Sequence, residues 1–269
     1  PQNLQIIGFQ AFQYCSKLEM VEIPASVTSI GGSAFADCDK FTAFQVAPEN
    51  DFYSSYYTGV WGLYSKDLSE LIAVPCGATG EFVVSEAVHT LSYGAFDGCD
   101  YLTKVVIPSS ISYIDDYAFA NCSGLTNVVI PASVDSLGNL VFNECTNLET
   151  VSFLGATPPA AIDLSNIFIG CPNLTTINVP EGSAENYNVS PFTSFVVNDA
   201  SLPTQVDVNG VRYNLNFTSV TAEVAGPLGE GFVGDLVLPE RITAYEQNFT
   251  VTTVAGYAFY DNTQMTSVT

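Results

Sequence analysis

The sequence contains very few basic residues. Only 6 of its 269 residues are lysine or arginine, against 28 aspartates and glutamates, which gives a formal net charge of -22 at pH 7. A surface of this charge repels phosphate backbones and anionic membranes. Nucleic acid is therefore not an expected partner, and the acidity instead suits solubility, exposure outside cells or weak cation binding.

Several motifs that carry chemistry are also missing. No apolar run reaches the roughly 20 residues of a membrane helix, so we expect no membrane insertion within this segment. The single histidine, His89, has no nucleophile motif such as Gly-x-Ser-x-Gly nearby, and there is no Cys-x-x-Cys pair or calcium-binding Asp-x-Asp-x-Asp-Gly loop. We expect no cofactor and no tight metal site; a pair of catalytic carboxylates is left open by this inventory.

What the sequence does contain is an internal repeat, which is the feature to identify before any other. Its motif, Ala-Phe-x-x-Cys-x-x-Leu-x-x-Val-x-Ile-Pro, is complete at residues 118–131 and occurs in seven copies separated by 23, 61, 23, 23, 26 and 91 residues. The phenylalanines that mark the copies are Phe12, Phe35, Phe96, Phe119, Phe142, Phe168 and Phe259.

The physical meaning of one copy can be read from its residues. Val128 and Ile130 alternate with other side chains at the period of a strand, and Pro131 ends it because proline has no N–H to donate. A second short extended piece follows at 133–137, and the segment up to Cys145 has room for only a turn or two of helix. One coil cannot bury its apolar face alone. Coils stacked about 4.8 Å apart would join their strands in a parallel sheet and their phenylalanines in a column.

The repeat resembles the leucine-rich repeats of the BspA-like bacterial surface antigens, whose pattern is Ile-Gly-x-x-Ala-Phe-x-x-Cys-x-x-Leu-x-x-Val-x-Ile-Pro-x-Ser-Val. The resemblance covers nearly the whole chain. It implies a β-rich leucine-rich-repeat solenoid of parallel stacked strands with short helical turns. It also implies a secreted or surface-attached bacterial protein, of a group in which several members are implicated in adhesion.

Breaks in the repeat predict the domain organisation. We expect a repeat array at 1–195 with an inserted antiparallel β island at 49–87, whose strands include 70–74 and 81–84. Residues 196–269 are expected to form a small all-β lead-in followed by the truncated start of a second array. The best linker candidate is 198–203, and turns are expected at 209–210 and 226–227. Both ends of the chain are expected to be cut from a longer protein, with a signal or anchor outside this segment.

Cysteines and carboxylates have plain structural interpretations. Six of the seven cysteines occupy one repeat position, so we expect a column of free buried thiols, although neighbours in it could approach disulfide distance. Cys76 lies outside the repeat position, in a turn, and is expected to be the most reachable thiol. A stripe of carboxylates beside the helical turns is expected to be solvated: Asp37, Asp39, Asp97, Asp100, Asp115, Asp116 and Glu144.

Two surfaces are candidates for ligand contact. The island carries Tyr53, Tyr56, Tyr57 and Trp61, and aromatic side chains on a projection can stack on sugars or anchor a protein. The alternative is that they pack the island onto the solenoid. Alternation along the strands also predicts a flat, nearly neutral outward face, from which Lys104, Asn127 and Thr150 are chosen as candidate contacts. The residues expected to face outward are Glu22, Gln45, Lys104, Val106, Asn127, Val129, Thr150 and Ser152.

These observations predict a surface-exposed or secreted leucine-rich-repeat protein that mediates adhesion to a host or matrix protein, or to a glycan. The alternative is a structural spacer with no specific ligand of its own. Catalysis is not expected, because a narrow stacked solenoid offers no deep pocket.

Overall fold

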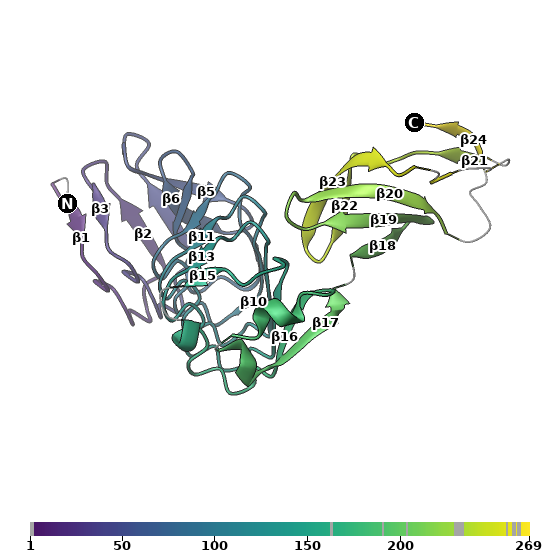
Figure 1. Ribbon diagram of the computed structural model, residues 1–269. Helices are drawn as coiled ribbons and strands as arrows, with labels where there is room; N and C mark the ends of the chain where they lie inside the picture. The colour runs from purple at the N-terminus through teal and green to yellow at the C-terminus, as the bar shows by residue number, and fades with distance from the viewer. Residues whose placement is uncertain are drawn as a thin grey trace.

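The computed structural model describes residues 3–161, 164–189, 191–202, 204–228, 234–256, 258–259, 262 and 265–269. Its N-terminal part is a solenoid of stacked coils, and its C-terminal part is a separate group of β-strands that lies against the end of the solenoid (Figure 1). The predicted solenoid of parallel stacked strands is therefore confirmed.

The strands predicted at the Val-x-Ile positions form the main face of the solenoid. They pair in parallel as β2–β4, β8–β10 and β12–β14–β16, with Val21 opposite Phe44 and Val128 opposite Val151. Among the described residues, strands β10 and β12 are not paired with each other. The bounds are β2 (Met20–Ile23), β4 (Ala43–Val46), β8 (Gly80–Val83), β10 (Leu102–Val106), β12 (Asn127–Ile130), β14 (Thr150–Phe153) and β16 (Thr176–Pro180).

A second ladder of two-residue strands runs along the other side of the coils, as the extended piece at 133–137 predicts. Tyr113 pairs with Thr90 before it and with Ser136 after it. The strands are β1 (Ile6–Ile7), β3 (Ser29–Ile30), β9 (Thr90–Leu91), β11 (Tyr113–Ile114), β13 (Ser136–Leu137) and β15 (Ala160–Ala161).

The predicted phenylalanine column holds the coils together. The rings of Phe96, Phe119, Phe142 and Phe168 stack in sequence, with centroids 4.9, 5.3 and 5.7 Å apart. Beside them Cys38, Cys122, Cys145 and Cys171 each donate the S–H to the carbonyl of the phenylalanine one coil earlier, as Cys145 does to Phe119 O at 2.9 Å. The coils are thus joined by ring stacking and by hydrogen bonds in the same column.

The segments between the two ladders are irregular turns rather than helices. Several of their residues have left-handed backbone angles, for example Asn121 with φ 56° and Glu144 with φ 58°. The helical segments found among the described residues are short 3-10 helices: η1 (Leu164–Asn166), η2 (Ala184–Tyr187) and η3 (Phe192–Ser194). Tyr187 and Phe192 are fully buried; Phe192 packs against Phe168, the last ring of the column, and Tyr187 packs against Phe192.

The predicted antiparallel island is present but shorter than expected. Strands β5 (Tyr53–Tyr57), β6 (Trp61–Ser65) and β7 (Glu70–Ala73) are antiparallel neighbours, while β8 belongs to the main parallel face. The extension of the island to 87 was wrong, because residues 74–84 form a coil of the solenoid. Phe82 of β8 lies opposite Val105, and Cys99 donates to Val74 O at 3.7 Å.

The C-terminal part is all-β, as predicted for the lead-in. A five-stranded sheet has the order β18-β19-β20-β23-β22, and β21 pairs with β24. Strand β17 (Val196–Leu202) extends the main solenoid face by pairing with β16, so residues 198–202 of the proposed linker are in a strand, and residue 203 lies outside the described residues. The other bounds are β18 (Gln205–Val208), β19 (Val211–Asn216), β20 (Thr221–Pro227), β21 (Gly234–Leu236), β22 (Arg241–Ala244), β23 (Gln247–Val254) and β24 (Met265–Val268).

Of the two turns predicted there, one is confirmed and one is wrong. Asn209 and Gly210 have φ of 51° and 80° and join β18 to β19 as a hairpin. Gly226 and Pro227 instead lie inside β20. Gly226 has φ 144°, and a Cβ on it would come within 2.7 Å of Ala258 O, so this glycine serves a close backbone approach within a strand.

Candidate functional site

The β5–β6 hairpin passes through the solenoid and divides its core. Leu63 and Tyr64 are both fully buried, but Leu63 packs with the N-terminal coils and Tyr64 packs with the coils that follow. The hairpin is therefore anchored by its own buried residues, and its outward side chains are free for another purpose.

The four island aromatics divide between the two predicted roles. Tyr53 has a structural role, because its hydroxyl accepts the N–H of Ile30 at 2.9 Å, and burial raises the pKa of Tyr53. Tyr56 packs its edge on Tyr64 with 6.1 Å between ring centroids. Tyr57 and Trp61 lie opposite each other on the hairpin, 5.3 Å apart, and are 56% and 46% exposed. Packing onto the solenoid accounts for Tyr53, while Tyr57 and Trp61 form an exposed aromatic pair.

A groove lies directly beside this pair. It has a volume of about 450 Å³ and is lined by the four residues of β4 together with Ser55 and Trp61. A second hollow of about 310 Å³ shares Gln45 and Val46 with it and extends over β2 and the turn after β4. The two form a trough along β4. Sequence analysis did not identify Ser55 or the edge of β4, because small and β-branched residues at such positions carry no distinguishing signal.

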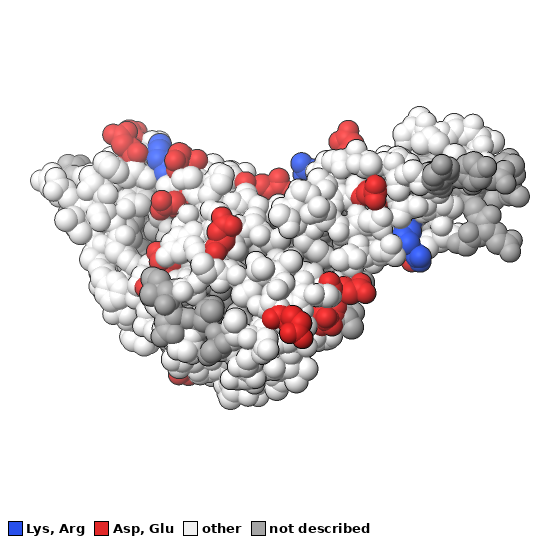
Figure 2. Space-filling view, in the orientation of Figure 1, with Lys and Arg blue, Asp and Glu red and all other residues white. Residues whose placement is uncertain are grey.

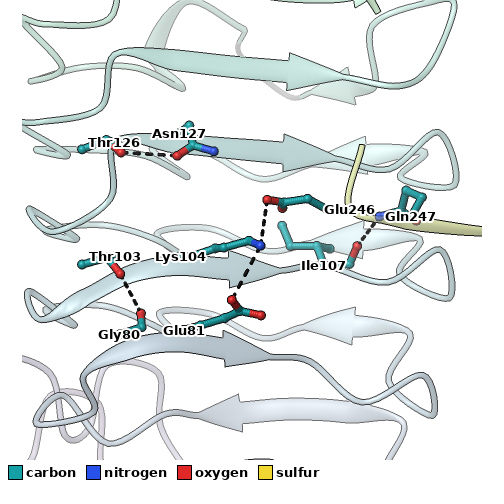
Figure 3. A network of polar contacts seen from close by, with 9 residues as sticks. All are labelled: Gly80, Glu81, Thr103, Lys104, Ile107, Thr126, Asn127, Glu246 and Gln247. Carbon is teal, nitrogen blue, oxygen red and sulfur yellow. Dashed lines mark hydrogen bonds and ion pairs between the residues drawn. The ribbon is translucent and has the colours of Figure 1, made fainter. Parts of the chain in front are cut away.

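The candidate contacts on the strand face lie elsewhere, on β10, β12 and β14. Asn127 and Thr150 are neighbours in register, and Asn127 is exposed. Lys104 is held by the chain itself, with Nζ 3.1 Å from Glu246 Oε1 and 3.6 Å from Glu81 Oε2 (Figure 3). The hydrogen bond that Lys104 donates to Glu246 is the main cause that raises the pKa of Lys104. No described contact joins these residues to the hairpin aromatics.

The expectation of an open, flat strand face was wrong at this end of the solenoid, because the C-terminal sheet lies on it. Val129 packs against the hydrophobic cluster of that sheet. Gln247, which is only 4% exposed, donates Nε2 to Ile107 O at 2.7 Å (Figure 3). In the next coil, Leu154 N–H fills the equivalent position by donating to Ile130 O at 2.9 Å. Pro131 has no N–H to offer Ile107, so the Gln247 side chain supplies the missing donor.

The predicted solvated acidic stripe was also wrong in part. Asp97 is only 6% exposed and accepts hydrogen bonds from Ser33 Oγ at 2.6 Å and Asn121 Nδ2 at 2.9 Å, in the coils on either side. Burial is the main cause that raises the pKa of Asp97. Asp116 likewise accepts the backbone N–H of Asn139 at 2.6 Å. These carboxylates join neighbouring coils, because each one accepts hydrogen bonds from residues of another coil.

Other carboxylates are scattered over the surface, with few basic residues between them (Figure 2). Within the described parts of the chain, no group of three or more histidine, cysteine, aspartate or glutamate side chains is arranged to hold a metal ion. The excess of carboxylates gives the surface a general negative field.

The cysteines are free, as expected, but Cys76 is not the reachable one. It is only 2% exposed, and its sulfur lies 3.3 Å from both Phe35 O and Asp97 O. Cys76 precedes Cys99 by one repeat of 23 residues and occupies the cysteine column. Cys15, in the first coil, is the exposed thiol. Burial raises the pKa of the Cys122 thiol well above its usual value, which keeps this thiol unreactive.

Comparisons with known proteins identify the repeat independently. Residues 1–61 and 75–195 match the model of the BspA type leucine rich repeat region in six copies. The gap from 62 to 74 covers most of β6 and all of β7, and the second match begins at the coil that contains Cys76. No curated protein sequence matches the chain significantly. Among the described residues, no helix has the length and apolar character needed to span a bilayer.

Solved structures of gut bacterial proteins share this fold. A leucine-rich repeat protein from Eubacterium ventriosum is 25% identical with a TM-score of 0.60, covering 76% of this chain and 54% of its own. A leucine rich cell surface protein from Faecalibacterium prausnitzii is 26% identical with a TM-score of 0.57, covering 74% and 52%. The pneumococcal vaccine antigen PcpA is similar in fold, with 19% identity and a TM-score of 0.53. The match covers 73% of this chain and 59% of the chain of PcpA. The chain spans about half the length of the first two relatives.

Proposed function

Because this chain belongs to the BspA-type leucine-rich repeat family of bacterial proteins, we propose that it is a surface-exposed or secreted protein that binds a host or matrix protein, or a glycan. One similar protein, from Faecalibacterium prausnitzii, is described as a cell surface protein. In this proposal the array at 1–195 carries the binding surface, and the lead-in at 196–269 braces the array. The role is adhesion rather than catalysis.

The observation that carries the proposal is the exposed pair of Tyr57 and Trp61 beside the trough along β4. Large aromatic side chains contribute much of the binding energy in interfaces, and here two of them remain exposed although the same hairpin buries Leu63 and Tyr64 completely. The trough gives them a concave surface on which a ligand can be enclosed.

The test is binding of the 269-residue chain to arrays of glycans and of matrix proteins. We expect at least one class of ligand to bind, and the double variant Tyr57→Ala/Trp61→Ala to lose at least about tenfold in affinity. Tyr101→Ala is the matched control, because Tyr101 is 49% exposed but lies on a turn outside the trough. Equal effects of the control and the double variant would contradict the proposal.

One observation favours the second candidate, a spacer that holds another domain away from the cell. Gln247 and Lys104 fix the C-terminal sheet to the strand face, which makes the junction between the two parts a braced one. A spacer predicts no binding on either array and no effect of the aromatic variants on any function of a longer protein.

A further inference from the structure

The main strand face is interrupted beside the hairpin, and this leaves part of β4 without a neighbouring strand. On one side β4 pairs with β2 along its whole length, from Met20 opposite Ala43 to Ile23 opposite Val46. On its other side, the described residues provide a single partner, Trp61 opposite Ala43. Strand β8, the main strand of the next coil, pairs with β10 and not with β4.

The unpaired groups can be identified from the direction of the backbone. In a parallel ladder, successive residues direct their N–H and C=O groups to opposite sides of the strand. Ala47 N–H donates to Ile23 O at 2.9 Å, toward β2, so the N–H and C=O of Val46 point the other way. No described donor or acceptor meets these two groups of Val46.

In other coils, the carbonyl at the repeat position of Val46 accepts a hydrogen bond. Ile130 O accepts the N–H of Leu154 from the next coil at 2.9 Å. Where Pro131 cannot donate, Ile107 O accepts Gln247 Nε2 from a different part of the chain at 2.7 Å. The solenoid face thus already contains one position at which a segment outside the array satisfies an unfilled strand carbonyl.

The space next to Val46 is suited to such a segment. The groove of about 450 Å³ runs along β4 and has Trp61 as a wall. Its lining contains no charged side chain, and the adjoining hollow contributes the carboxylate of Glu22. With a net charge of -22, the molecule attracts basic segments and repels acidic ones.

We propose that this groove binds an extended polypeptide segment of a partner protein, which adds as a strand along the open edge of β4. The proposal rests on the proposed binding function and specifies the ligand class. Main-chain groups of the segment pair with the N–H and C=O of Val46, and an apolar side chain packs on Trp61. A strand edge offers alternating donors and acceptors at the spacing of a polypeptide, which the hydroxyls of a glycan do not reproduce.

The experiment uses a displayed library of random linear peptides selected on the whole chain. Trp61 is the only tryptophan of the sequence, so its fluorescence reports directly on the groove during titration with a synthetic selected peptide. We expect selected peptides rich in β-branched and aromatic residues without acidic clusters, and a fluorescence change on binding. N-methylation of alternate peptide amides should weaken binding at least about tenfold, while methylation of the amides between them should not.

Two variants of one residue separate backbone recognition from side-chain contact. Val46→Pro removes the N–H that points into the groove, without removing a hydrogen bond of the free protein, and proline is tolerated at a strand edge. Val46→Thr keeps the N–H and the β-branched shape. We expect Val46→Pro to lose at least about tenfold in peptide affinity and Val46→Thr to retain it, with both variants unfolding at temperatures close to the parent.

The possible outcomes distinguish this inference from the proposed function. If peptides bind but the two Val46 variants behave alike, strand addition is overturned while protein binding stands. If only a glycan array gives binding and Trp61→Ala abolishes it, the inference is overturned and the proposed function stands. If peptides, proteins and glycans all fail to bind the folded chain, both are overturned in favour of the spacer.

Discussion

The regular coils and the hairpin junction solve the same packing problem with different residues. In the regular coils, Phe96, Phe119 and Phe142 stack almost parallel. At the junction, Val74 takes the place of a phenylalanine in the hydrogen-bonding pattern, while Leu63 and Tyr64 of the hairpin enter the core. The core is thus continuous at the junction although the repeat motif is absent there. The absence of the motif affects the surface instead, where aromatic side chains are exposed and one strand edge is unpaired.

The largest effect should come from the regular coils. Phe119→Ala removes a fully buried ring from the middle of the column and should lower the free energy of unfolding by about 3–5 kcal/mol because it leaves a cavity. Phe12→Ala, at a 40% exposed ring of the same repeat position, is the control and should cost about 1 kcal/mol. Urea denaturation measures both. Similar losses of unfolding free energy for the two variants would contradict a column whose rings are buried in the middle and exposed at the first coil.

A smaller effect is expected where buried carboxylates join the coils. Asp97→Ala leaves Ser33 Oγ and Asn121 Nδ2 without their acceptor and should cost about 1–3 kcal/mol. Asp97→Asn keeps the shape and should cost less. If the alanine variant unfolds at the same urea concentration as the parent, the buried carboxylate is not a link between coils.

Asp97 also gives a prediction about pH. Because burial raises its pKa, the folded chain holds this proton at pH values where the unfolded chain has already released it. The contribution of Asp97 to stability is therefore most favourable below the unfolded pKa of about 3.9, and it falls as pH rises through the raised folded pKa. In urea denaturation from acid to neutral pH, the parent should lose stability relative to Asp97→Asn as the pH rises. A parent that gains stability relative to Asp97→Asn over this range would contradict the sign.

The brace between solenoid and C-terminal sheet should contribute less than the core. Gln247→Ala leaves Ile107 O without a donor and should cost about 1 kcal/mol. In the Gln247→Ala variant, hydrogen exchange should show that β22 and β23 open faster than the coils. Gln205→Ala, which removes an exposed hydrogen bond to Asn214 in the same sheet, is the control and should leave exchange at β22 and β23 unchanged.

The smallest effect on stability is expected at the exposed aromatic pair. Tyr57→Ala/Trp61→Ala should change the free energy of unfolding by less than about 1 kcal/mol, because both rings are largely in solvent. The same variant is expected to lose binding. A large loss of stability in urea denaturation would mean that the pair packs the hairpin onto the solenoid, which is the structural alternative considered for these residues.

How far the sequence predicts this molecule depends on the range of the contacts involved. The phenylalanine column and both ladders follow from the repeat, because each coil contacts its neighbours at a fixed spacing. The coil at Val74 and Cys76 was predictable too, since Cys76 and Phe82 lie one repeat before Cys99 and Val105. It was missed because the phenylalanine that marks the other copies is absent there.

Contacts outside the repeat spacing could not be predicted in this way. Gln247 and Ile107 are 140 positions apart, and no periodic signal relates them. The exposure of Tyr57 and Trp61, and the burial of Tyr53 close to them, depend on the angle at which the hairpin crosses the coils. A single sequence gives the composition of that hairpin but not the angle.

The division of the core by the hairpin has a mechanical consequence. The N-terminal cluster, from Ile7 to Leu63, is packed separately from the cluster that begins at Tyr64 and continues to Phe192. A pulling force on the first coils is therefore transmitted to the rest through the hairpin and through polar contacts with the following coils, such as Ser33 to Asp97 and Gly77 N–H to Phe41 O. Under tension the first coils should open as one unit, while the array behind them stays folded with its thiols and its phenylalanine column still covered.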